Sequence, residues 1–212
     1  MGLFKDYINQ TRKPEGFLGK LMLNGMNAGH AKLADWGLEY LPPLSPERAA
    51  DLGCGGGRNL AALLRRYPSV KVMGVDYSPL SVQKARKMNQ AAVHAGRCTV
   101  TEASVLTLPM EADRFDLATA FETIYFWPGL EACFCETWRI LKPGALFLIV
   151  NESDGTDAAG IKFAKIIDGM RIYTAEQIQG ALEKAGFHNI RTAHHASKTW
   201  TAVLAEKPEE RK

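Results

Sequence analysis

A glycine-rich turn directly follows a short apolar run in the first third of the chain. Glycines stand at positions 53, 55 and 57 of the sequence Asp-Leu-Gly-Cys-Gly-Gly-Gly, which begins at Asp51. Because glycine has no Cβ, the backbone can turn sharply there and a ligand can come close to it. A dinucleotide turn, Gly-x-Gly-x-x-Gly, would need a glycine where Arg58 stands. The spacing therefore indicates an adenosine cofactor without a pyrophosphate and disfavours a nicotinamide-dependent oxidoreductase.

Further polar and aromatic residues follow the next three apolar runs. Asp76 lies about 20 residues past the glycine turn, where a carboxylate accepts hydrogen bonds from both ribose hydroxyls. Ser104 and Val105 follow the third run and suit the amine and the ring face of adenine. A cluster of aromatic residues stands at the end of the fourth run: Phe121, Tyr125, Phe126 and Trp127. Such a cluster is typical of the floor of a ligand pocket. These residues also have purely structural interpretations. Asp76 would then be a negative charge that stabilises the N-terminus of the next helix, and each aromatic ring would pack in the core.

These residues need a scaffold that brings the ends of several strands together. Short apolar runs alternate with amphipathic segments, which predicts a mostly parallel sheet with helices on both faces, an α/β fold. We expect strands at 48–52, 70–75, 97–103, 115–121, 145–151, 188–196 and 199–206, and helices at 30–41, 59–67, 78–95, 130–141, 157–168 and 174–186. The last two strands form a hairpin, so one of them runs antiparallel to the rest. In such a sheet, ligands bind outside the carboxyl ends of the strands.

Composition limits the class of protein. The 212 residues suit one domain, and a net charge of +3 without a basic stripe gives no support for a nucleic-acid partner. The four cysteines lack the spacing of a metal or disulfide site, so we expect no metal. No apolar run is long enough to cross a membrane and no signal peptide is apparent, which predicts a cytoplasmic protein without a membrane partner. A monomer or a homodimer is expected.

The motifs resemble those of the class I S-adenosylmethionine-dependent methyltransferases, of the small-molecule, type 11-like group related to enzymes of ubiquinone and menaquinone biosynthesis. The matching segments are 51–57, 75–78, 108–109, 114–117, 139–144 and 174–187. The resemblance implies a Rossmann-like seven-stranded sheet of order 3-2-1-4-5-7-6 with strand 7 antiparallel. It implies S-adenosyl-L-methionine as cofactor and S-adenosyl-L-homocysteine as product. The expected domains are a lid over 1–44, the methyltransferase domain over 45–206 and a flexible tail over 207–212.

The resemblance also assigns roles in cofactor binding. Residues near the methionine part of the cofactor would be Asp51, Gly53, Cys54, Gly55 and Gly57, with Phe121 and Glu122 flanking that end. Asp76 would hold the ribose, and the adenine would lie beside Tyr77, Ser104 and Val105. Many relatives carry an acid where Ala103 and Ser104 stand, so here the Ser104 hydroxyl or the Val105 amide would contact the adenine edge.

Methyl transfer from a sulfonium mainly requires alignment, because the methyl group is already activated. A general base is needed only when the nucleophile arrives protonated, so no catalytic residue is obligatory. The candidates for catalysis are His30, Glu122 and Tyr125, and the candidates for substrate binding are Asn27, His30, Tyr125, Phe126 and Trp127. The expected reaction is in-line transfer to a small-molecule acceptor. The alternative is a catalytically silent protein that binds S-adenosylmethionine or acts in regulation.

Overall fold

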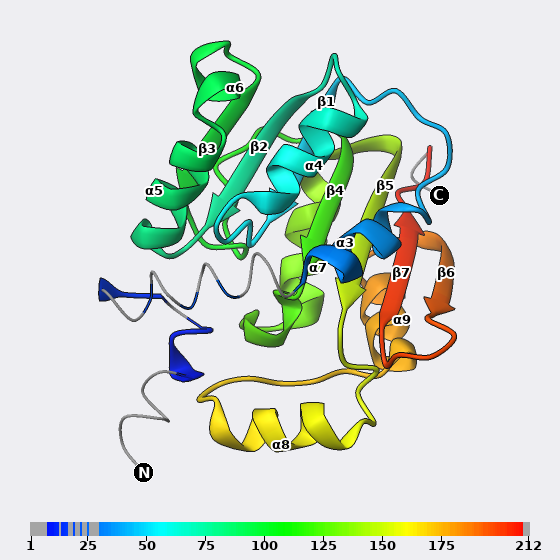
Figure 1. Cartoon of the computed structure of the whole chain (residues 1–212). Coiled ribbons are helices and arrows are strands. Elements are labelled where there is room, and N and C mark those ends of the chain that lie inside the picture. Colours follow the sequence, from blue (N-terminus) through cyan, green and yellow to red (C-terminus); the bar gives the residue numbers. More distant parts are fainter. Residues whose placement is uncertain are drawn as a thin grey trace.

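A seven-stranded sheet forms the centre of the protein in a computed structural model that describes residues 8–12, 14–16, 19, 22, 25 and 30–209. The strand order is β3-β2-β1-β4-β5-β7-β6, and β7 is antiparallel to its neighbours (Figure 1). The strands are β1 (Arg48–Leu52), β2 (Lys71–Asp76), β3 (Cys98–Glu102), β4 (Phe115–Phe121), β5 (Leu141–Asn151), β6 (His188–His194) and β7 (Thr201–Glu206). The predicted fold class, strand order and antiparallel strand are confirmed.

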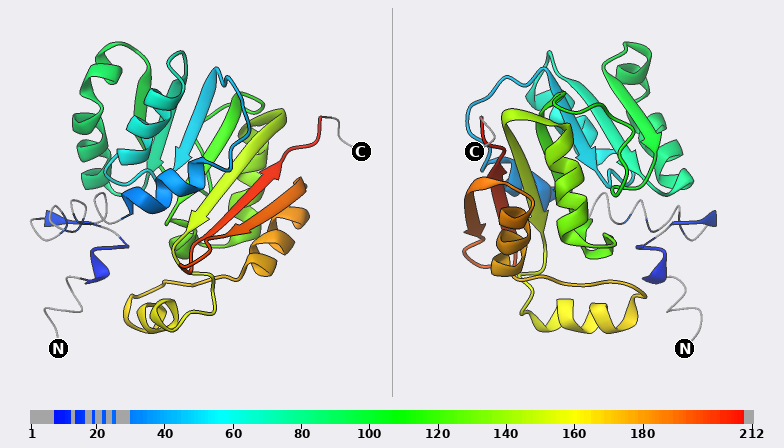
Figure 2. Two further views of the ribbon diagram at one scale, coloured as in Figure 1. Left: turned by 45° about the vertical axis from the view of Figure 1, so that its right-hand side comes forward. Right: turned by 180° about the vertical axis from the view of Figure 1, so that it is seen from behind.

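Helices cover both faces of the sheet (Figure 2). One buried cluster joins α3 (Ala31–Leu38), α4 (Arg58–Arg66) and α5 (Pro79–Met88) to one face of the sheet. A second cluster joins α7 (Leu130–Ile140) and α9 (Ala175–Lys184) to the opposite face. Central strands packed on both faces explain the nearly continuous apolar runs in β4 and β5. A further helix, α8 (Ala158–Ile166), lies beyond the carboxyl end of β5, away from both layers (Figure 1).

The helix predicted over 78–95 is divided in two. It ends at Met88, and α6 (Gln90–His94) follows after Asn89. Asn89 is only 5% exposed, and its Nδ2 donates to the carbonyls of Gly57 at 2.9 Å and Ala85 at 3.0 Å. The side chain therefore ties α5 to the glycine turn, a long-range contact that periodicity does not reveal.

The predicted flexible tail does not begin at residue 207. Lys207 is 3% exposed, and its backbone continues the pairing with β5 through Gly144 and Ala145. Its Nζ donates to Asp113 at 2.6 Å and to the carbonyl of Leu141 at 2.6 Å. A buried ammonium needs such partners, which explains why the chain stays packed here beyond the last strand. Within the described ranges, no helix combines the length and apolar character needed to cross a bilayer.

Candidate functional site

A cavity of about 330 Å³ opens at the carboxyl ends of β1, β2 and β4. This is where the strand order reverses, since β1 pairs with β2 on one side and β4 on the other. Its walls come from the glycine turn, from the loops after β2, β3 and β4, and from the start of α3. The volume suits a small organic ligand. The sequence therefore predicted the location of the cavity correctly.

Two glycines of the turn are required by packing. Gly53 has φ +79°, and a Cβ there would lie 1.9 Å from Oγ1 of Thr123. Gly57 has φ +83°, and a Cβ there would lie 2.7 Å from Cα of Ala85. Gly55 differs, because its φ is +50° but nothing lies within 4 Å of its Cβ position. Gly53 and Gly55 line the cavity, whereas Gly57 does not and acts as the N-cap of α4.

Asp76 lines the cavity at the end of β2 and is fixed by backbone amides. Its Oδ2 accepts from the amide of Gly55 at 2.9 Å, and its Oδ1 accepts from the amide of Ser78 at 2.9 Å. Burial raises the pKa of Asp76, and the two backbone bonds partly offset this. The Ser81 side chain also hydrogen-bonds this carboxylate, whose oxygens together offer about four acceptor sites, so capacity remains for a hydroxyl donor from the cavity.

Asp51 lies beneath the turn and does not line the cavity. It is 1% exposed, its Oδ1 accepts from Oγ1 of Thr119 at 2.7 Å, and its Oδ2 has no hydrogen-bond partner among the described residues. Burial raises its pKa to about 7. Direct approach to a ligand, as predicted for Asp51, therefore has no support in the geometry, because the side chain is covered.

The buried carboxyl of Asp51 gives a stability prediction. The pKa of Asp51 is about 7 in the folded protein, which is higher than in the unfolded chain. The folded protein therefore loses stability as pH rises from the pKa of the unfolded state to that of the folded state. We expect Asp51→Asn to raise the melting temperature at pH 8 without ligand, because the amide removes the cost of a buried charge. The gain should vanish at acidic pH, where Asp51 is protonated. Thermal melts across pH test this, and a uniform loss of stability at every pH would contradict it.

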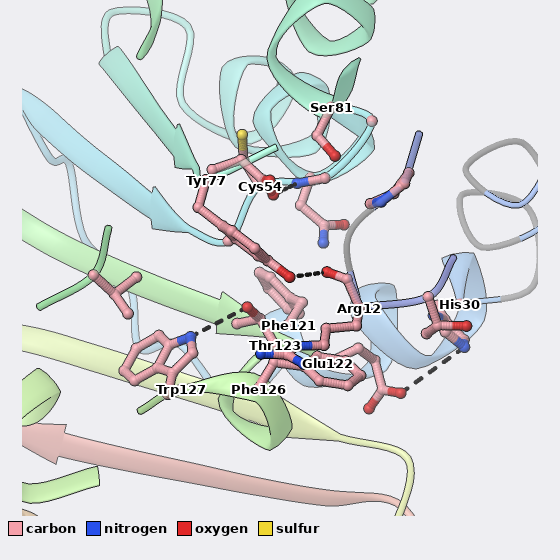
Figure 3. Close-up of a pocket in the computed structure, with 18 of the residues that line it drawn as sticks. Arg12, His30, Cys54, Tyr77, Ser81, Phe121, Glu122, Thr123, Phe126 and Trp127 are labelled. Carbon is pink, nitrogen blue, oxygen red and sulfur yellow. Dashed lines mark hydrogen bonds and ion pairs between the residues drawn. The ribbon is translucent and has the colours of Figure 1, made fainter. Parts of the chain in front are cut away.

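Three titratable side chains meet at one end of the cavity. His30, the N-cap of α3, points toward Glu122 after β4 (Figure 3), and its Nε2 lies 3.8 Å from Oε2 of that carboxylate. The same nitrogen lies 3.6 Å from Oε2 of Glu152, the residue after β5. His30 and Glu122 line the cavity, whereas Glu152 lies outside its wall. The sheet thus brings together two predicted residues and one, Glu152, that the sequence did not single out.

Glu122 is held in an unusual conformation. Its φ is +58°, a left-handed value that a non-glycine residue adopts only when its surroundings impose it. Its Oε1 accepts from the hydroxyl of Tyr125 at 3.1 Å and from the amide of Glu152. These bonds leave Oε2 facing His30. The left-handed backbone at Glu122 therefore occurs together with a fixed orientation of its carboxylate.

The charges of this cluster depend on one another. Burial raises the pKa of Glu122 to about 7, although His30 and hydrogen bonds oppose the rise. Burial alone would lower the pKa of His30, but Glu152 and Glu122 outweigh it and the net pKa is raised. The cluster therefore exchanges a proton near neutral pH, which is where a general base is most effective. The ligand atoms of His30, Glu122 and Glu152 also lie within 4.8 Å of one another, a juxtaposition that the expectation of no metal did not foresee.

The aromatic residues after β4 divide into two groups. Phe126 and Trp127 line the cavity, together with Phe121 at the end of the strand. Tyr125 does not line it, is 3% exposed, and its hydroxyl also accepts from the amide of Ser153 at 3.1 Å. The structure therefore gives no support to its predicted contact with a substrate, because the hydroxyl is bonded to Glu122 and Ser153. Ile124–Phe126 form a short 3₁₀ turn, in which consecutive side chains point in different directions around the axis, so neighbouring rings face different surroundings.

The remaining predicted cofactor residues lie in the cavity wall. Cys54, Tyr77, Ser104 and Val105 all line it, and Ser104 Oγ accepts from the amide of Leu106 at 3.2 Å. Tyr77 is 40% exposed, and its hydroxyl donates to the carbonyl of Arg12 (Figure 3). Cys54 belongs to the expected methionine side of the cavity and Tyr77, Ser104 and Val105 to the expected adenine side, and these roles stay predictions.

Part of the N-terminal segment contributes to the cavity wall. Thr11, Arg12 and Pro14 line it, and Ser78 Oγ donates to the carbonyl of Pro14 at 3.0 Å. Asn27, a predicted substrate residue, lies outside the described residues. Sequence reasoning did not single out Arg58 as a cavity residue; its position directly after the glycine turn was the signal.

The comparisons with known proteins come from sequence and from structure. Residues 50–149 match the sequence model of a methyltransferase domain family. The 24-methylenesterol C-methyltransferase 3 of Arabidopsis thaliana is 27% identical over 168 residues, which is 73% of this chain and 46% of that protein. The methyltransferase phqN of Penicillium fellutanum is 28% identical over 66% of this chain and 46% of its own length. The chain thus spans about half the length of these relatives.

Solved structures agree with the fold. A chain from the complex between the Haloferax volcanii Trm112 methyltransferase activator and a methyltransferase superposes with a TM-score of 0.81 at 19% identity, over 97% of this chain and 98% of that one. The N-methyltransferase 2 of Haemonchus contortus, solved with phosphomonomethylethanolamine and S-adenosylhomocysteine, gives 0.78 at 16% identity, over 98% of this chain and 61% of that one. These likenesses confirm the fold, and the match over residues 50–149 agrees with the resemblance drawn from the motifs.

Proposed function

We propose that this chain, whose residues 50–149 match a methyltransferase domain family, transfers a methyl group from S-adenosylmethionine to a small-molecule acceptor. The observation that carries the proposal is the cavity at the carboxyl ends of β1, β2 and β4, with the glycine turn and Asp76 on one side and His30 with Glu122 on the other. The relatives support small-molecule chemistry, since one is named for sterol C-methylation and others as O-methyltransferases.

The cavity residues suit the parts of this cofactor. Asp76 accepts hydrogen bonds from the ribose hydroxyls, and Ser104 and Val105 lie toward the adenine. The open side of Gly55 lets the methionine part approach the backbone. Phe121, Phe126 and Trp127 provide apolar walls that exclude water from the sulfonium and the acceptor. When bound, the cofactor supplies an activated methyl group, and the protein aligns the acceptor with it.

The cluster around His30 receives the proton of the acceptor. The acceptor's oxygen or nitrogen attacks the methyl carbon, the carbon–sulfur bond breaks, and its electron pair stays on sulfur to give S-adenosylhomocysteine. The proton that the acceptor loses moves to the imidazole of His30, and Glu122 and Glu152, which face its Nε2, stabilise the imidazolium. Tyr125 has no direct role in this scheme, since its hydroxyl orients Glu122.

Turnover separates this proposal from its alternative. Incubating the protein with S-adenosylmethionine and a pool of small hydroxylated and aminated metabolites should release S-adenosylhomocysteine above background. A protein that binds the cofactor but releases no product with any pool would instead be a silent S-adenosylmethionine-binding or regulatory protein. Absence of cofactor binding in calorimetry would contradict both. We also propose a cytoplasmic monomer or homodimer, which fractionation and sedimentation test.

Metal removal tests the proton-transfer role of the cluster. Although His30, Glu122 and Glu152 lie close enough to share an ion, we expect EDTA to change kcat by less than about twofold, because the activated methyl group needs no Lewis acid. Added Mg²⁺, Mn²⁺ or Zn²⁺ should not raise the rate. An activity that EDTA abolishes and one of these ions restores would contradict the proposal and assign the cluster to a metal.

A further inference from the structure

Arg58 is a cationic residue of the cavity that the proposed function has not used. It is the first residue of α4, directly after the glycine turn, and it lines the cavity. Its side chain is 18% exposed, and its Nη2 donates to Oδ1 of Asp35 at 2.6 Å. Its Nη1 donates to Oδ1 of Asn59 at 3.1 Å. A guanidinium has five N–H donors, so these two bonds fix its plane and leave other donors for a ligand.

The other cations of the cavity wall make their contacts with elements other than the glycine turn. Arg12 is exposed, and its Nη1 donates to the carbonyl of Asp168 at 3.4 Å, away from the glycine turn. His30 stands between the carboxylates of Glu122 and Glu152. Among the described residues that line the cavity, Arg58 is therefore the cation placed beside the turn, where the methionine part of the cofactor is expected.

The proposed cofactor carries a carboxylate that requires a cationic partner when it is buried. The methionine part of S-adenosylmethionine carries a carboxylate, which costs free energy to bury without a cation or several N–H donors. Arginine binds carboxylates through two parallel N–H bonds, and its position on the first turn of α4 adds the favourable field of a helix N-terminus. Asp35, on α3, holds the guanidinium from the outside and is 60% exposed.

We infer that Arg58 binds the carboxylate of the cofactor's methionine part, and that Asp35 is its positioning residue. The inference rests on the proposed function, because it assumes S-adenosylmethionine in the cavity. It also makes a new statement about specificity: the chain distinguishes the cofactor from a decarboxylated one through Arg58. The same arginine that breaks the dinucleotide glycine pattern thereby selects an amino-acid-bearing nucleoside.

Two matched ligands test the inference by calorimetry. S-adenosylhomocysteine carries the carboxylate, and S-adenosyl-3-thiopropylamine is the same molecule without it. We expect Arg58→Gln to weaken binding of the first about tenfold to a hundredfold and to change the second by less than about twofold. Arg65→Gln, an exposed arginine on the same helix, should leave both affinities unchanged. The affinity of Arg58→Lys for S-adenosylhomocysteine should lie between those of the wild type and Arg58→Gln. Lysine keeps the positive charge but cannot donate two parallel N–H bonds to a carboxylate.

The possible failures are distinguishable. An equal loss for both ligands in Arg58→Gln, or no loss for either, would overturn the role of Arg58 while leaving methyl transfer intact. A wild-type chain that binds neither ligand would instead contradict the proposed function. If Arg58→Gln does not fold, Asp35→Asn takes its place, because Asp35 is 60% exposed. A severalfold loss confined to S-adenosylhomocysteine is then expected, and an unchanged affinity would contradict the positioning role.

Discussion

Replacement of His30 by alanine is expected to lower kcat about a hundredfold or more for an acceptor that arrives protonated, since general bases typically contribute 10²–10⁴-fold. The imidazole lines the cavity and is the group of the cluster that faces both carboxylates, at 3.8 and 3.6 Å. Cofactor affinity should change little, because the proton is transferred from the acceptor. Product formation at saturating cofactor and calorimetry with S-adenosylhomocysteine give the two readouts.

The pH dependence identifies the base. Since the pKa of His30 is raised and that of Glu122 is raised to about 7, the cluster is protonated in acid, and kcat should rise with pH through the neutral range and level off on its alkaline side. Glu122→Gln removes a carboxylate that raises the pKa of His30, so the rise should move to lower pH. The amide can still accept from Tyr125, which keeps the local structure.

Controls separate a chemical role from a structural one. His94→Ala, at an exposed position at the end of α6, should leave the rate and the pH profile unchanged. An unaltered kcat in His30→Ala, with an acceptor of ordinary hydroxyl pKa, would contradict the assignment of the base. A wild-type rate that does not depend on pH between 5 and 9 would contradict it as well, because every member of the cluster would then be irrelevant to the slow step.

Sequence patterns predicted the parts of this site that strands position. Gly53 and Glu122 each follow a strand directly and Asp76 ends one, and the ends of parallel strands meet at one edge of the sheet. Once the alternation of strands and helices is recognised, such residues must come together. The sheet order was implied by the resemblance, and the pairing of β1 with β2 and β4 agrees with it.

The errors concern side-chain direction and contacts between distant segments. Asp51 and Tyr125 lie within one or two residues of cavity residues, but both point into packed regions. Asn89, which divides the helix, acts through Gly57, 32 residues earlier. Glu152 follows β5 as Glu122 follows β4, and its nearness to His30 depends on how α3 packs across the sheet. None of these contacts leaves a local signature in the sequence.

Replacement of Asp76 by alanine is expected to weaken cofactor binding by about 1–3 kcal/mol, or roughly 5- to 150-fold, from the loss of charge-assisted hydrogen bonds to the ribose. Asp76 is 8% exposed at the cavity wall, and the amides of Gly55 and Ser78 hold both its oxygens in place. Glu102→Ala is the matched control, since this exposed carboxylate ends the neighbouring strand and does not line the cavity.

The loss could also arise because Gly55 is released from Asp76, so the ligand must separate the two causes. An analogue of S-adenosylhomocysteine that lacks the ribose 2′-hydroxyl removes one donor without changing the protein. The wild type should bind this analogue more weakly than S-adenosylhomocysteine, whereas Asp76→Ala should bind the two almost equally, because the partner of the hydroxyl is gone. If the variant discriminates between the two ligands as strongly as the wild type does, Asp76 does not hold the ribose, and its part is to fix the glycine turn.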